Sequence, residues 1–88
     1  MRLLIKSEIR IPLAIESGEV GNIDQWLIRS GLKYSTEQSN GNFCFIIPPQ
    51  GCFMDEQKMN NLFYNVFFMS NLKISYRPLP DEFTLTVN

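Results

Sequence analysis

Residues 34–47, YSTEQSNGNFCFII, decide the fold, because they predict a β-hairpin with a defined turn. The pair Asn40-Gly41 is typical of a two-residue type I′ turn, whose twist matches that of the strands it joins. The turn sets a register that pairs Gln38 with Phe43, Thr36 with Phe45 and Tyr34 with Ile47. The opposite face of the hairpin then presents Ser35, Glu37, Cys44 and Ile46. We expect the aromatic face to be turned toward the core, where phenylalanine is most often found.

The segment before the hairpin begins with a predicted strand. From Leu3 to Ile15 apolar residues alternate with polar ones, which is typical of a strand with one buried face. A strand of that length would span roughly 43 Å, which is longer than most strands. We therefore expect a bend or a bulge near Lys6–Glu8.

A first helix is predicted between this strand and the hairpin. From Val20 to Ser30 apolar residues recur at helical spacing, and Trp26 among them is expected to lie in the core. Asn22 is the predicted N-cap, with Gln25 completing a capping box. Gly31 is a typical left-handed stop.

A second helix is predicted after the hairpin, from the N-cap residue Asp55 to Asn71. Its core face comprises Met59, Leu62, Phe63, Val66, Met69 and Ser70. Its outward face comprises Gln57, Asn61, Tyr64 and Phe68. Tyr64 and Phe68 are therefore expected to be neighbouring aromatic rings on the side that meets solvent.

Two further alternating segments, Leu72–Arg77 and Glu82–Val87, predict a closing hairpin. Residues 1–88 then form a single α+β domain with the ferredoxin-like order β-α-β-β-α-β and an additional C-terminal strand. We expect an antiparallel sheet with two helices on one face. The additional strand is expected to form an edge, and its sequence contains no lysine or proline that would discourage pairing with another chain.

The composition limits the chemistry that is open to this chain. Histidine is absent, which removes the commonest general base and metal ligand. Two cysteines, Cys44 and Cys52, make no zinc site within one chain. We therefore expect no catalytic residue, no cofactor and no metal. The formal net charge of −1 is unlike that of duplex-binding proteins.

The function we expect is that of a small non-enzymatic protein-binding module, such as a regulator, an inhibitor or an accessory subunit that occludes a partner protein. The sequence shows no apolar run long enough to span a bilayer and no signal peptide, so we expect a cytoplasmic location without a membrane partner. The partner is expected to be another protein, with a second copy of this chain as one candidate. The predicted contacts are Tyr64, Phe68, Asn61, Asn65, Phe83 and Leu85.

Two alternatives use the sheet instead. The segment Asn42–Ile46 is similar to the third strand of RNA-recognition modules, and this resemblance implies base stacking on Phe43 and Phe45. Single-stranded RNA or DNA would then also contact Arg2, Lys6 and Arg10. The first strand has no aromatic residue to complete such a site, which favours the core interpretation. The other alternative is a dimer of two ferredoxin-like sheets that encloses a small molecule.

Overall fold

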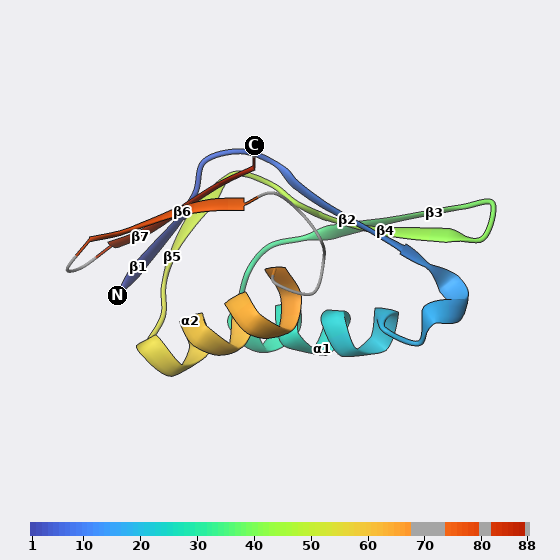
Figure 1. Cartoon of the computed structure of the whole chain (residues 1–88), viewed down its shortest axis with the longest axis horizontal. Helices are drawn as coiled ribbons and strands as arrows, with labels where there is room; N and C mark the ends of the chain where they lie inside the picture. The colour runs from blue at the N-terminus through green and yellow to red at the C-terminus, as the bar shows by residue number, and fades with distance from the viewer. Residues whose placement is uncertain (68–73, 80–81, 88) are drawn as a thin grey trace.

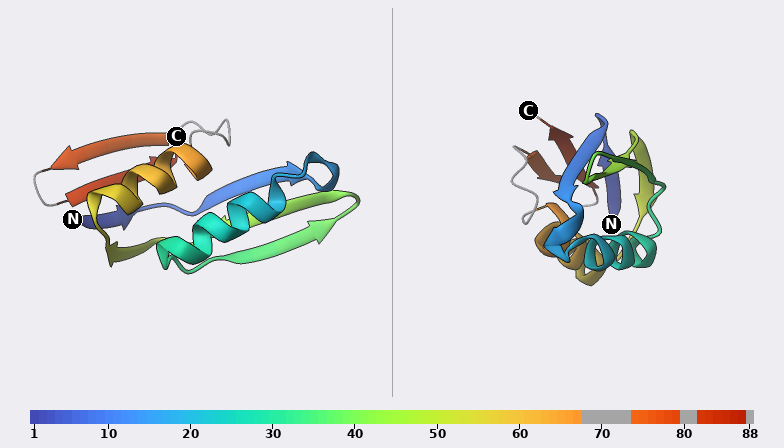
Figure 2. Two further views of the ribbon diagram at one scale, coloured as in Figure 1. Left: turned by 90° about the horizontal axis from the view of Figure 1, so that it is seen from below. Right: turned by 90° about the vertical axis from the view of Figure 1, so that its right-hand side faces the viewer.

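The computed structural model describes residues 1–67, 74–79 and 82–87 of the 88-residue chain. Within these ranges the chain is α+β, with two helices on one face of two small sheets (Figures 1 and 2). The N-terminal half contains β1 (Arg2–Ile5), β2 (Ile9–Ala14), a 3₁₀ turn (Ile15–Ser17), α1 (Val20–Ser30), β3 (Ser35–Ser39) and β4 (Asn42–Ile47). The rest contains β5 (Gln50–Phe53), α2 (Glu56–Leu62), a π-helical segment (Phe63–Phe67), β6 (Ile74–Leu79) and β7 (Glu82–Val87). The sheets have the strand orders β5–β1–β7–β6 and β2–β4–β3.

The bend that the sequence predicts in the first strand is confirmed, because β1 and β2 are separated at Lys6–Glu8. The flanking register pairs Ile5 with Gln50 and Ile9 with Ile47. Three residues, 6–8, therefore lie opposite only two, Pro48 and Pro49. One extra residue on one strand is a β-bulge, which bends the strand and increases its twist. The same segment thus belongs to one sheet before the bulge and to the other sheet after it (Figure 1).

The β3–β4 hairpin has the predicted turn and register. Asn40 and Gly41 have φ angles of 49° and 79°, and a type I′ turn requires both to be positive. Phe45 lies opposite Thr36 and is fully buried, and Phe43 is half-buried against the same core. The centroids of the two phenylalanine rings lie 5.0 Å apart in an edge-to-face arrangement. Both rings therefore belong to the core between the sheet and the helices.

Helix α1 has the predicted bounds and the predicted end, but a different start. Gly31 is left-handed, with φ 76°, and its N–H donates to the Ile28 carbonyl at 3.2 Å. The predicted N-cap, Asn22, is wrong, because the helix begins at Val20 and Asn22 already lies within its first turn. The residue before the helix is Glu19, whose N–H donates to Ser17 Oγ at 3.2 Å.

The second helix begins as predicted but does not continue as an α-helix. Asp55 caps it, since Asp55 Oδ1 accepts a hydrogen bond from the Lys58 N–H at 2.7 Å. From Phe63 to Phe67 the chain is π-helical, with hydrogen bonds over five residues instead of four. Val66 and Phe67 are both buried as a result. The predicted residues beyond Phe67 on this helix, 68–71, lie outside the described residues.

The prediction that the last strand forms an edge is wrong. β7 lies between β1 and β6, parallel to β1 and antiparallel to β6, so the sheet is not antiparallel throughout. β2 belongs to the second sheet and pairs there with β4, whereas β1 pairs with β5 on one side and with β7 on the other. The Lys6 N–H extends the pairing by donating to the Leu85 carbonyl at 3.0 Å. In the predicted ferredoxin-like order the strand after α2 would lie directly beside β1.

Gln50, the first residue of β5, holds the connection between α1 and β3 in place through hydrogen bonds to Lys33. Its side-chain oxygen accepts from the Lys33 N–H at 2.8 Å, and its Nε2 donates to the Lys33 carbonyl at 2.8 Å and to the Pro48 carbonyl at 3.2 Å. We expect Gln50→Ala to lower the free energy of unfolding by about 1–2 kcal/mol, because these backbone groups lose their partner. Urea denaturation measures the change, and Gln57→Ala at an exposed position of α2 is the control. Equal stabilities of the two variants would contradict the prediction.

Tyr34 ties the start of β3 to α1, because its hydroxyl donates to Asp24 Oδ1 at 2.5 Å. This hydrogen bond, with some help from burial, raises the pKa of Tyr34 above its ordinary value of 10.0. The stabilisation is therefore fully present below pH 10 and is lost as the pH rises through the pKa of the folded state. We expect Tyr34→Phe to cost about 0.5–1.5 kcal/mol at neutral pH. The difference should shrink in unfolding curves measured at increasing pH above about 10, and a difference that stays constant would contradict the prediction.

Candidate functional site

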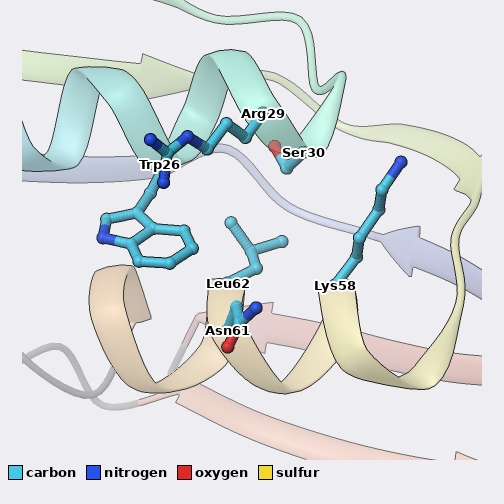
Figure 3. Close-up of a pocket in the computed structure, with 6 residues that line it drawn as sticks. All are labelled: Trp26, Arg29, Ser30, Lys58, Asn61 and Leu62. Carbon is cyan, nitrogen blue, oxygen red and sulfur yellow. The ribbon is translucent and has the colours of Figure 1, made fainter.

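A groove lies between the two helices, on the side that faces away from the sheets (Figure 3). α1 and α2 run in opposite directions, so the C-terminal half of α1 lies beside α2 (Figure 2). The groove has a volume of about 390 Å³ and is lined by Trp26, Arg29, Ser30, Lys58, Asn61 and Leu62. This size is at the lower end of the range for pockets that bind a small ligand or a protruding side chain.

The base of the groove is apolar. Leu62 belongs to the core and is 1% exposed, and Trp26 packs against the core with part of its ring still accessible. The expectation that Trp26 contributes to the core is thus confirmed, although the same ring also lines the groove (Figure 3). Ser30 belongs mainly to the helix end, because its Oγ donates to the Leu27 carbonyl and accepts from the Leu32 N–H.

Two cations lie at the groove, one from each helix. The Arg29 guanidinium carbon is 5.3 Å from the centroid of the Trp26 ring, which is a cation–π contact. Lys58 extends from α2 on the other side (Figure 3). Within residues 1–67, 74–79 and 82–87, the ion pairs are those of Arg10 with Glu8 and Glu37. The described part of the chain therefore leaves the charges of Arg29 and Lys58 without an acidic side chain in contact.

The residues predicted on the outward face of α2 have different environments. Asn61 lines the groove, and Tyr64, three residues further on, is 61% exposed. Asn65 is half-buried, and its Nδ2 donates to the Asn61 carbonyl at 2.8 Å. Phe68 lies outside the described residues. Tyr64 therefore remains the exposed aromatic residue of the predicted patch, with Asn61 one turn before it.

The two residues predicted from the last strand do not form an exposed contact surface. Leu85 is fully buried opposite Ile5, so its predicted role as a partner contact is corrected to a core role. Its strand is central, and its side chain points toward the helices. Phe83 is half-buried, and its ring centroid is 6.4 Å from that of Phe63. Phe63 in turn contacts Tyr64 edge to face, with 5.6 Å between the ring centroids.

The alternative nucleic-acid site is not assembled on the described sheet. Phe43 and Phe45 face the core, and Arg10 is held by acidic neighbours, with Arg10 Nε 3.1 Å from Glu8 Oε2 and Nη1 3.3 Å from Glu37 Oε2. These contacts, led by the hydrogen bond to Glu8, raise the pKa of Arg10 above its ordinary value. The nucleic-acid hypothesis requires exposed aromatic rings for base stacking and an unpaired cation beside them. In the described structure the two rings pack against the core and Arg10 is paired with two glutamates.

The described residues show no other arrangement of chemically reactive groups. They contain no group of three or more metal-ligating side chains, and no helix among them is both long and apolar enough to cross a membrane. Cys44 and Cys52 are free thiols, and burial raises the pKa of the Cys52 thiol. No family model, curated protein or solved structure matches the chain. The groove and Tyr64 are therefore defined as a candidate site by their geometry.

Sequence reasoning missed the contribution of α1 to this site. Trp26 and Arg29 are three residues apart, which places them on neighbouring positions of one helix and predicts their contact. Their juxtaposition with Lys58 depends on how α1 packs against α2, and periodicity within each helix does not determine that. The predicted site thus included Asn61 but not the residues across from it.

Proposed function

We propose that this chain is a small non-enzymatic protein-binding module that docks a partner on the outer side of α1 and α2. The main support is the groove between the helices, which combines an accessible Trp26 ring with the Arg29 guanidinium, together with the exposed Tyr64 in the π-helical segment that follows α2. Tryptophan, arginine and tyrosine are the residues that contribute most often to binding energy at protein interfaces. Their combination on one side of a small domain favours a protein contact.

The arrangement also fits a mode of action by occlusion. The helices form one layer and the sheets the other, so a partner can cover the helical side without disturbing strand pairing (Figures 1 and 2). A regulator, an inhibitor or an accessory subunit needs only such a surface. The nucleic-acid hypothesis has less support, because both of its stacking residues pack into the core.

We also propose that the fold is a variant of the ferredoxin-like arrangement. The order of the elements up to β6 and the position of both helices on one side support this assignment. The variation is that β7 is inserted between β1 and β6. The helical side is unchanged by this insertion and remains available for binding.

The test compares two substitutions at equally exposed positions. Tyr64 is 61% exposed on the proposed surface, and Ile28 is 62% exposed on α1 but does not line the groove. We expect Tyr64→Ala to lose a protein that the wild type retains in affinity purification from the native host, since truncating an aromatic interface anchor costs about 1–2 kcal/mol or more. Ile28→Ala should retain that protein. The proposal fails if both variants retain the same proteins as the wild type.

A further inference from the structure

We infer that the groove between α1 and α2 binds an acidic segment of the partner protein, with one apolar side chain inserted between Trp26 and Leu62. This inference rests on the proposed function and adds the chemistry of the partner. It is based on the charge of the groove, the apolar character of its base and its size.

The charge of the groove is positive although the chain as a whole has a formal net charge of −1. Arg29 and Lys58 approach it from different helices (Figure 3). The acidic residues nearest to Lys58 along the chain are Glu56, which forms no ion pair within the described residues, and Asp55, whose carboxylate accepts from the Lys58 backbone N–H as the helix cap. Asp24 on α1 accepts from the Tyr34 hydroxyl. A negatively charged ligand would supply the counter-charge that the described residues do not.

The Arg29 guanidinium is presented in a way that suits a carboxylate. Its contact with the Trp26 ring, at 5.3 Å from the centroid, limits the orientations of the side chain. A guanidinium that lies over a ring keeps the N–H groups at its edge available for hydrogen bonding. Arginine binds carboxylates through two parallel hydrogen bonds of this kind. Lys58 would add a second, less directional positive charge.

The apolar base and the volume of the groove indicate which groups the ligand carries in addition to a carboxylate. Leu62 and the accessible part of Trp26 offer no hydrogen bond from the floor, apart from the indole N–H of Trp26, so an aliphatic or aromatic group is preferred there. The volume of about 390 Å³ accommodates one anchoring side chain and a neighbouring carboxylate rather than a whole domain. A short segment in which an apolar residue is flanked by Asp or Glu has this chemistry.

The experiment uses synthetic peptides of about eight residues with a central leucine or phenylalanine flanked by glutamates. Trp26 is the only tryptophan of the chain, so its fluorescence reports directly on occupation of the groove. We expect the wild type to bind these peptides with a change in Trp26 emission. Affinity should fall several-fold between about 50 and 300 mM salt, because screening weakens exposed charge pairs. Peptides with lysine in place of glutamate, or alanine in place of the anchor, should not bind.

Matched variants test the two cations. Arg29→Gln and Lys58→Gln should each weaken binding of a fluorescently labelled acidic peptide by about 2–5-fold. Lys6→Gln removes the same charge at the exposed bend between β1 and β2 and should leave binding unchanged. Anisotropy of the labelled peptide is the second readout, because Arg29→Gln also alters the surroundings of the Trp26 ring.

The inference would be overturned by no binding of any acidic peptide, by equal binding of the lysine peptides, or by an equal loss in Lys6→Gln. Tighter binding of a single-stranded oligonucleotide would assign the groove to nucleic acid and would also overturn it. If acidic peptides fail while Tyr64→Ala still loses a partner that Ile28→Ala retains, only the charge inference is wrong. If the peptides bind the groove but no partner depends on Tyr64, the use of Tyr64 in the proposed function is wrong.

Discussion

Phe45→Ala is expected to lower the free energy of unfolding by about 3–5 kcal/mol, because it removes a fully buried ring from the centre of the core. Phe45 lies opposite Ile11 on β2, and its ring centroid is 5.0 Å from that of Phe43 and 6.0 Å from that of Tyr34. A chain of this size has a total stability of the order of 4–13 kcal/mol, so the expected loss is a large fraction of it and, at the lower end of that range, all of it. Urea denaturation followed by circular dichroism measures the loss.

The control for this substitution is the next residue on the same strand. Cys44 is only half-buried and lies on the opposite face of β4, so Cys44→Ala should change the stability by less than about 1 kcal/mol. Phe45→Leu, which fills more of the space, should cost less than Phe45→Ala. If Phe45→Ala kept its stability, the ring would not be a core residue, and base stacking on the sheet would again be a reasonable hypothesis.

The parts of the fold that the sequence predicts well are determined by neighbouring residues. Asn40-Gly41 specifies the hairpin turn because few other pairs adopt two consecutive positive φ angles. Gly31 ends α1 for a similar reason. The bulge at Lys6–Glu8 was predictable because an alternating segment of that length exceeds what a straight strand in a small domain accommodates.

The π-helical segment shows why a correct count of apolar residues led to an incomplete prediction. The sequence LFYNVFF, residues 62–68, has more apolar residues than one face of an α-helix needs. The helical periodicity places two of them, Tyr64 and Phe68, on the side that meets solvent. In the π-helical segment Phe67 is buried together with Val66, which the periodicity already placed on the core face, and Tyr64 stays exposed. Part of the surplus is thus used within the core, which reduces the predicted binding patch.

The position of β7 and the composition of the groove depend on contacts between segments that are distant in the sequence. Glu82–Val87 alternates in the same way whether it is an edge or a central strand. Its pairing with β1 on one side and with β6 on the other places it between them, and neither pairing follows from the alternation. Likewise, nothing near Lys58 in the sequence indicates that Trp26 and Arg29 lie across from it.

Leu85→Ala is expected to lower the free energy of unfolding by about 2–5 kcal/mol, because Leu85 is fully buried opposite Ile5 in the middle of the sheet. Had β7 been an exposed edge, the same substitution would have left stability nearly unchanged and would have affected only the binding of a partner. Chemical denaturation therefore distinguishes a central β7 from an edge β7, and it does so even when the partner is unknown.

Thr84→Ala is the matched control, since Thr84 is the preceding residue on β7 and its side chain lies on the other face of the sheet, where it donates to Glu82 Oε1 at 3.2 Å. Its cost should be below about 1 kcal/mol, because a hydrogen bond that remains partly accessible to water contributes little net stability. Leu85→Met, which conserves most of the volume, should retain most of the stability that Leu85→Ala loses. A loss at Leu85 as small as that at Thr84 would mean that the inner face of β7 is not packed against the core, and the core role of Leu85 would have to be abandoned.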